Sequence, residues 1–163
     1  NYPRAVSKIV ANPDRNLQYI EVGAGLGEFI TKLIDNQIDK RPIVIDPAPY
    51  GVMQEMLEYI LQLVKIETHY ERCLKLIERA KLMQNTEKVN LINLTLKDAI
   101  VQHPEIKGIG DLLVDNYGGV IWSTKEMGNR PNDILNLEGL LLKENGILYT
   151  QEYSLIKKNG KME

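Results

Sequence analysis

Short apolar runs alternate along this chain with longer segments whose apolar residues recur at helical spacing. Five runs are typical of buried strands, at residues 17–22, 42–46, 89–96, 111–115 and 147–153. Helical spacing is found at residues 5–10, 29–36, 52–64, 67–83 and 133–142. Strands that alternate with helices predict an α/β fold with a doubly wound, mostly parallel sheet. In such sheets, ligands gather at the carboxyl ends of the strands.

The segment after the first predicted strand carries the strongest local signal. Here three glycines alternate with other residues, in the order Glu21-Val22-Gly23-Ala24-Gly25-Leu26-Gly27, and a helical pattern begins at Glu28. Glycine tolerates positive φ and, having no Cβ, lets a ligand approach the backbone. The start of a helix adds unpaired N–H groups and a partial positive charge. The segment therefore predicts a site for a nucleotide-like cofactor with a negative group.

The spacing of these glycines differs from that of dinucleotide-binding turns. Those turns have the pattern G-x-G-x-x-G, with pyrophosphate against the helix end. In this chain the position of the third glycine of that pattern is taken by Glu28. An acid there would repel a pyrophosphate, so the spacing favours a different cofactor. A glycine-rich turn that binds no ligand is the simpler alternative.

At these residues the chain resembles the class I S-adenosylmethionine-dependent methyltransferases, whose first motif is (E/D)-x-G-x-G-x-G. Glu21, Gly23, Gly25 and Gly27 match it in register, and the order of elements over residues 17–153 agrees as well. The resemblance implies a Rossmann-like sheet of strand order 3-2-1-4-5 and S-adenosylmethionine as the cofactor. The four motif residues and Ala24 are then expected to bind it.

An acid ends the second predicted strand. Asp46 follows Gly23 by 23 residues, and a carboxylate at this point can accept both hydroxyls of a ribose that lies over the glycine turn. The resemblance implies this role for Asp46 and places Pro47 and Ala48 against the adenine ring. A turn acid before proline is the structural alternative.

A second acid, Asp98, is predicted to end the third strand. The resemblance implies that Asp98 binds the adenine amino group and that Ala99 offers its backbone N–H nearby. The alternative for Asp98 is an N-cap of the following short helix, since Asp is a common cap residue.

The fourth strand leads into Asp115-Asn116-Tyr117-Gly118-Gly119. The family has its fourth motif here, beside the methyl group, so the resemblance implies that Asp115, Asn116 and Tyr117 hold or deprotonate the methyl acceptor and that Asp115 also contacts the cofactor. The segment differs from the D-P-P-Y form of many amino-methylating enzymes that act on nucleic acids. A turn that merely ends the strand is the alternative, and the need for a general base stays open.

Composition and charge say little about the methyl acceptor and other binding partners. A net charge of −2 gives no basic field for phosphates, so the acceptor, although unidentified, is expected to be a small molecule or a protein rather than RNA. One cysteine and two scattered histidines predict neither a disulfide nor a metal site. No apolar run approaches the ~18 residues of a membrane span, and the cytoplasm is the expected compartment.

Two features depart from the usual layout. Residues 47–88 have room for two helices, the second rich in alternating charge, which favours a solvated helix, with a lid or a dimer contact as the alternative. Few residues follow the fifth strand, so residues 1–163 are expected to form one domain whose last strands are short or missing. Its oligomeric state stays open. A spermidine synthase-like aminopropyltransferase and a non-catalytic cofactor-binding scaffold are the alternatives in function.

Overall fold

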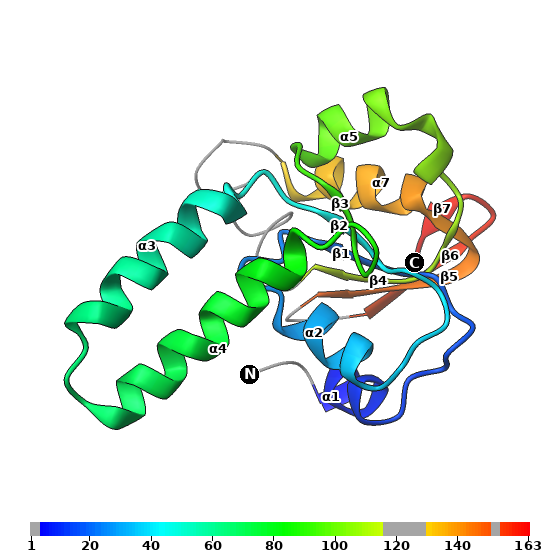
Figure 1. Ribbon diagram of the computed structural model, residues 1–163. Helices are drawn as coiled ribbons and strands as arrows, with labels where there is room; N and C mark the ends of the chain where they lie inside the picture. The colour runs from blue at the N-terminus through cyan, green and yellow to red at the C-terminus, as the bar shows by residue number, and fades with distance from the viewer. Residues whose placement is uncertain (1–3, 116–129, 151–153) are drawn as a thin grey trace.

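Strands and helices alternate along the chain much as the apolar pattern predicts (Figure 1). The computed structural model describes residues 4–115, 130–150 and 154–163. The strands are β1 (Tyr19–Val22), β2 (Ile43–Ile45), β3 (Asn90–Ile92), β4 (Gly110–Asp115), β5 (Leu142–Thr150), β6 (Ser154–Lys158) and β7 (Lys161–Met162). The helices are α1 (Arg4–Ala11), α2 (Glu28–Asp35), α3 (Tyr50–Leu63), α4 (Glu67–Met83), α5 (Leu96–Gln102) and α7 (Pro131–Leu141), with a 3-10 turn at Pro104–Ile106.

All described strands form a single sheet in the order β3-β2-β1-β4-β5-β6-β7. The pairs among β1 to β5 are parallel, whereas β6 and β7 are antiparallel to their neighbours. The predicted doubly wound sheet and its 3-2-1-4-5 order are therefore confirmed. The last two strands are present and short.

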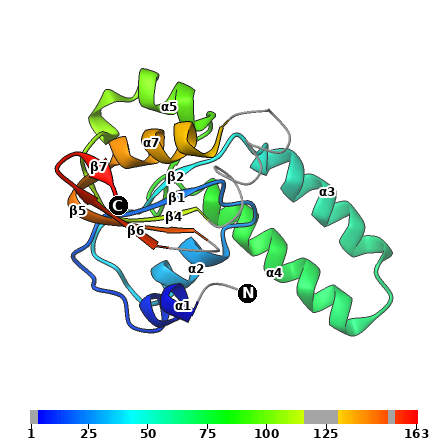
Figure 2. The ribbon, with the colours of Figure 1, turned by 180° about the vertical axis from the view of Figure 1, so that it is seen from behind.

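Each face of the sheet is covered by its own helices (Figures 1 and 2). The two-residue period of a strand sends successive side chains to opposite faces. Ile20 and Val22 of β1 therefore join the apolar cluster of α5 and α7, while Tyr19 joins that of α1 and α2. There the Tyr19 ring meets Phe29 edge-on, with 6.3 Å between the ring centroids. The parallel strand ends are thus held between two packed layers.

Two predicted strands have different limits in the structure. β3 ends at Ile92 rather than Leu96, because Leu96 is buried as the first residue of α5. β5 begins at Leu142 rather than Ile147, and its register with β4 shifts between Gly110 and Leu112. Asn145, which lies within β5, has a φ of 64°.

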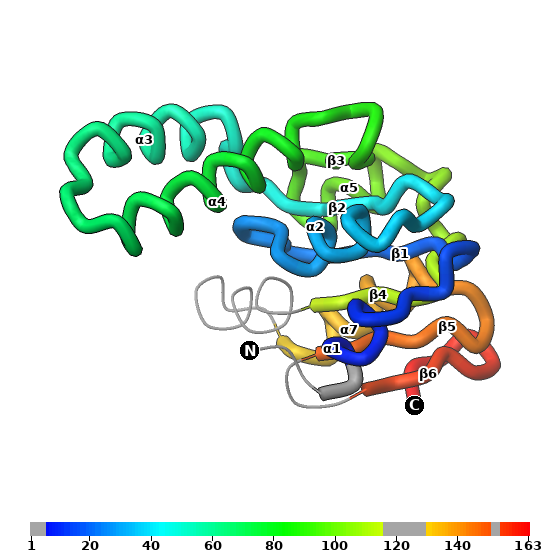
Figure 3. Tube along the Cα trace, turned by 60° about the horizontal axis from the view of Figure 1, so that its bottom comes forward, coloured from blue at the N-terminus to red at the C-terminus, as the bar shows by residue number. Residues whose placement is uncertain are grey.

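The connection from β2 to β3 is a hairpin of α3 and α4 that projects from the sheet (Figures 1 and 3). Cys73 and Ile77 of α4 are buried, and the Cys73 thiol donates to the Leu57 carbonyl of α3 at 3.2 Å. Lys81 forms an ion pair with Glu58 across the hairpin at 3.2 Å. The predicted charged face of α4 is exposed, as a solvated helix requires. Within the described residues, none of the helices has the length and apolar character to cross a bilayer.

Candidate functional site

The glycine turn links β1 to α2 in a conformation that favours glycine. Gly23, Gly25 and Gly27 have φ values of 63°, 54° and 63°, in the left-handed region that L side chains rarely adopt. The Gly23 N–H donates to the Ile45 carbonyl and the Gly27 N–H to the Ala24 carbonyl, both at 2.9 Å. The Gly25 N–H donates to Asp46 Oδ2 at 2.8 Å. The N–H groups of all three glycines are thus already bonded within the chain. The space beside Gly25 stays open, with no atom within 4 Å of the position a Cβ would take.

Glu21, the acid of the motif, is buried beneath the turn and is 1% exposed. Gly27 is the N-cap of α2 and has no side chain to bond the first turn. The Glu21 carboxyl instead accepts a hydrogen bond from the Ile30 N–H, which supplies part of the missing cap. Burial, reinforced by the charges of Asp46 and Asp115, raises the pKa of Glu21 well above its usual range. Glu21 therefore has a structural contact at the start of α2.

Gly27→Ala is expected to destabilise the fold more than Gly108→Ala. Both glycines have a left-handed φ, but a Cβ at Gly27 would lie 2.8 Å from Met83 Sδ, whereas one at Gly108 meets no atom within 4 Å. The backbone strain of ~1–2 kcal/mol is common to both variants, and overpacking adds ~1–3 kcal/mol at Gly27 alone. Urea unfolding of the two variants measures the difference. Equal losses would show that Met83 moves aside without cost.

Asp46 lies against the glycine turn, where the ribose role requires it. The residue is 5% exposed, and its carboxylate accepts hydrogen bonds from the N–H groups of Gly25 and Ala48, each at 2.8 Å, and from the Tyr50 hydroxyl at 3.1 Å. Burial and the negative charge of Asp46 raise the pKa of Tyr50, so the phenol stays a donor. A carboxylate has about four acceptor positions, so Asp46 can accept one more donor without breaking these bonds.

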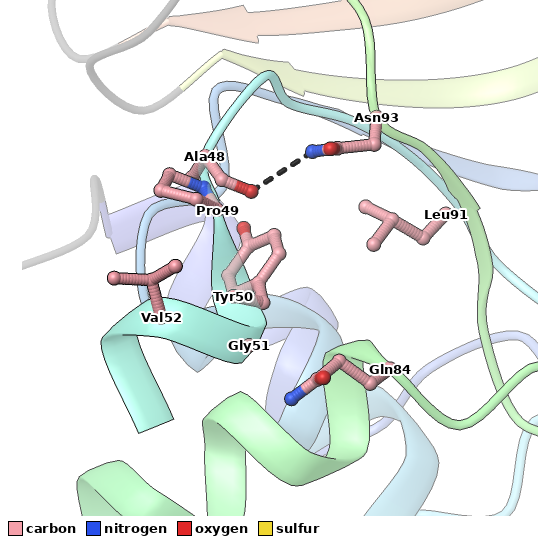
Figure 4. Close-up of a pocket in the computed structure, with 8 residues that line it drawn as sticks. All are labelled: Ala48, Pro49, Tyr50, Gly51, Val52, Gln84, Leu91 and Asn93. Carbon is pink, nitrogen blue, oxygen red and sulfur yellow. Dashed lines mark hydrogen bonds between the residues drawn. The ribbon is translucent and has the colours of Figure 1, made fainter. Parts of the chain in front are cut away.

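A cavity of about 300 Å³ opens beside Asp46, between the start of α3 and the end of β3 (Figure 4). Its lining residues are Ala48, Pro49, Tyr50, Gly51, Val52, Gln84, Leu91 and Asn93. Ala48 is a wall of this cavity, whereas its exposed neighbour Pro47 is not among the lining residues. The walls are mostly apolar, with amide groups at Gln84 and Asn93.

Asn93 is the polar residue that follows β3, and the sequence analysis missed it. Its Nδ2 donates to the carbonyls of Asp46 and Ala48, both at 2.8 Å. Within the described chain, no donor bonds its Oδ1. Asn93 therefore holds the loop after β2 and offers an acceptor at the cavity. Its signal in the sequence was its place directly after the apolar pair Leu91-Ile92.

Asp98 does not end β3, and that prediction is wrong. It is an exposed residue in the first turn of α5. Its carboxylate accepts the Thr95 hydroxyl at 2.6 Å, and its N–H donates to Thr95 Oγ1 at 3.2 Å. These reciprocal bonds cap the start of α5. The alternative given for Asp98, an N-cap, is close to this, but the N-cap residue is Thr95. The Ala99 N–H is also committed, since it donates to the Thr95 carbonyl at 2.8 Å.

Asp115 ends β4 beside a second buried acid. It is 3% exposed and pairs in register with Val22 of β1 and Thr150 of β5. Glu138 of α7 is 0% exposed, and neither oxygen of its carboxyl has a hydrogen-bond partner among the described residues. Burial first, and then the Asp115 charge, raise the pKa of Glu138 well above its usual range, which favours the protonated form of this carboxyl.

Glu138 is a second residue that the sequence analysis missed. It lies four residues after Ile134 and three before Leu141, both buried, so its position on the apolar face of α7 was a possible signal. The other predicted acceptor residues, Asn116 and Tyr117, lie outside the described residues.

Comparison with known proteins supports the fold. No protein-family model and no curated protein matches the sequence. Similar solved structures include an antibiotic-related methyltransferase (19% identity, TM-score 0.50, 89% of this chain covered). YcgJ from Bacillus subtilis (13%, 0.52, 90%) and an O-methyltransferase family protein from Burkholderia thailandensis (14%, 0.51, 90%) are also similar. The chain has the class I methyltransferase fold. It spans 61%, 49% and 36% of those three chains, respectively.

Proposed function

We propose that this chain binds S-adenosylmethionine and transfers its methyl group to an acceptor. The contact of Asp46 Oδ2 with the Gly25 N–H at 2.8 Å carries the proposal, because it joins the acid after β2 to the glycine turn after β1. A nucleoside at this edge of the sheet has its ribose hydroxyls near a fixed carboxylate. The near-neutral charge of the chain favours a small molecule or a protein as acceptor over RNA.

The cavity beside Asp46 fits the base of such a cofactor. Ala48 and Leu91 supply apolar walls, and about 300 Å³ is within the usual size of small-molecule sites. The Asn93 Oδ1 can accept from an exocyclic amino group, which is the role first predicted for Asp98. Asn93 is therefore proposed as the polar group that recognises the base.

Charge supports a cationic ligand. Asp46 and Asp115 bring negative charge to the ends of β2 and β4, and none of the ion pairs within the described residues involves Asp46. When bound, S-adenosylmethionine supplies an electrophilic methyl group on a positively charged sulfur. The site should therefore favour it over its neutral-sulfur product.

The chain's own part in the transfer is to orient the acceptor and hold a proton. Asp115 can accept a hydrogen bond or a proton from the acceptor, while the raised pKa of the buried Glu138 favours a neutral carboxyl there. Asn116 and Tyr117 are proposed to hold the acceptor. Alignment of the two reactants is the larger contribution, worth up to ~7–11 kcal/mol.

Titration calorimetry with S-adenosylmethionine tests the proposal on three chains. The wild-type chain should bind. Asn93→Leu should weaken binding by roughly tenfold or more, because the amino group of the base loses its acceptor. Asp98→Leu should bind like wild type. Absence of binding to the wild-type chain would overturn the function. A loss in Asp98→Leu with none in Asn93→Leu would overturn the assignment of Asn93.

Turnover separates an enzyme from a scaffold. Release of the demethylated product from S-adenosylmethionine in the presence of pooled small-molecule and protein acceptors is expected. Binding without release on any pool would favour the non-catalytic module.

A further inference from the structure

One face of α3 is apolar and exposed. Its five side chains are between 44% and 64% exposed, and they are Val52, Met56, Tyr59, Ile60 and Leu63. We call this set the α3 stripe. The other apolar side of the helix, which includes Leu57, is covered by α4. Helix α3 is therefore apolar on two sides, and the described structure covers only one of them.

The spacing of the stripe is that of a coiled-coil seam. Val52, Met56, Tyr59 and Leu63 are separated by four, three and four residues, the intervals of a heptad seam. This order is the same in both directions along the helix. Two antiparallel copies related by a twofold axis would therefore pair Val52 with Leu63 and Met56 with Tyr59, apolar with apolar along the whole stripe.

The position of the hairpin permits this arrangement. The hairpin of α3 and α4, which bears the stripe, projects from the sheet (Figures 1 and 2). Two helices pack with their axes 8–10 Å apart. Parallel copies at that distance would bring the two sheets against each other, whereas antiparallel copies keep them at opposite ends of the seam.

Area and charge favour a second copy as the occupant. The five side chains are about half exposed, so complete coverage of the stripe would bury at most roughly 500 Å² on each chain and about 1,000 Å² in total, the lower limit for a specific interface. Helix α3 has two acids and neither Lys nor Arg, so it lacks the cations that hold amphipathic helices on membranes. In the antiparallel pair Glu55 falls opposite Ile60 rather than another acid.

We infer that the α3 stripe is the seam of an antiparallel homodimer. The pairing is independent of the methyl transfer proposed above. Val52 is both the end of the stripe and a wall of the cavity beside Asp46. The Leu63 end of the second copy would therefore lie next to that cavity.

Mass measured by light scattering tests the dimer. The wild-type chain at micromolar concentration should have twice its monomer mass of 18.6 kDa. Met56→Glu should raise the dissociation constant by roughly a hundredfold or more and give the monomer mass, since a charge would enter the seam. A wild-type chain that stays monomeric would overturn the inference.

Two control variants test which surface is used. Tyr70 of α4 is an exposed aromatic residue. It lies eleven residues, or about three helical turns, before Lys81. Tyr70 is therefore on the face of α4 that carries the Lys81–Glu58 ion pair. Val101 of α5 is 71% exposed. Tyr70→Glu and Val101→Glu should both leave the dimer intact. A dimer that dissociates in either control as it does in Met56→Glu would show that the stripe is not the seam.

Cysteine crosslinking tests the antiparallel direction. An oxidised mixture of the Val52→Cys and Leu63→Cys chains should form a disulfide dimer, because the two positions meet across the twofold axis. Leu63→Cys alone should not crosslink. Crosslinking of Leu63→Cys with itself and none in the mixture would indicate parallel copies and overturn the arrangement.

Discussion

Gly25→Val is expected to abolish S-adenosylmethionine binding while the chain still folds. The new side chain would enter the open space beside Gly25, which the proposed function gives to the cofactor. A branched side chain at a φ of 54° also strains the backbone whose N–H holds Asp46. We expect a loss of at least about a hundredfold in affinity, equivalent to ~2.7 kcal/mol, measured by titration calorimetry.

Gly108→Val is the matched control for this variant. Gly108 also has a left-handed φ and open space at the position of its Cβ, but it follows the 3-10 turn at Pro104–Ile106, away from the glycine turn. Both variants should lose a similar ~1–2 kcal/mol of stability from backbone strain. Only Gly25→Val should lose binding. Wild-type affinity in Gly25→Val would mean that the cofactor does not lie over the turn.

The second large effect concerns Glu138, whose replacement by Gln should stabilise the chain at neutral and higher pH. The pKa of Glu138 in the folded chain is raised well above the ordinary value of 4.5. Below that ordinary value, both folded and unfolded chains carry the proton. Above it, the unfolded chain loses the proton and the folded chain keeps it. Stability therefore falls as pH rises, by ~1.4 kcal/mol per pH unit until the folded chain also ionises.

Gln keeps the shape of the protonated acid and can donate to Asp115, but it does not titrate. The stability gained by Glu138→Gln should thus be small near pH 4.5 and grow with pH. Urea unfolding at several pH values measures it. Glu71→Gln, the same change at an exposed position of α4, should show no such growth. Identical pH slopes for Glu138→Gln and wild type would mean that Glu138 is already ionised in the folded chain.

The buried Glu21 should leave part of the pH dependence in place. Its pKa is raised by the same cause, burial, so Glu138→Gln alone should not give a flat profile. Both acids lower stability in the same direction as pH rises. The chain should therefore be more stable in mild acid than at alkaline pH.

The sheet could be predicted because each strand is an apolar run of residues that stops at a glycine or a polar residue. In β1 and β4 the runs stop at the glycine turn and at Asp115, and the parallel order follows from the alternation with helices. Asp46 was placed correctly at the glycine turn for this reason. Its role toward a ribose stays a prediction.

The end of the third strand was predicted wrongly because a strand pattern and a helix-start pattern overlap there. Leu94 and Leu96 continue the alternation of a strand, yet Thr95 and Asp98 have the spacing of a capping pair that starts a helix. The helix forms from Leu96 because its side chain and that of Ala99 are then buried in the apolar cluster under α5. Asn93 and Glu138 needed the fold itself, since each acquires its role from residues far away in the sequence.

The three donors that fix Asp46 in the free chain have a consequence for recognition. A sugar that docks there meets an acceptor already locked in position, so little conformational freedom has to be given up on association. Selectivity at this point would come from rigid complementarity rather than from induced fit. A competitor without a sugar hydroxyl at this point would lose the hydrogen bond to Asp46, and no flexible group is there to compensate.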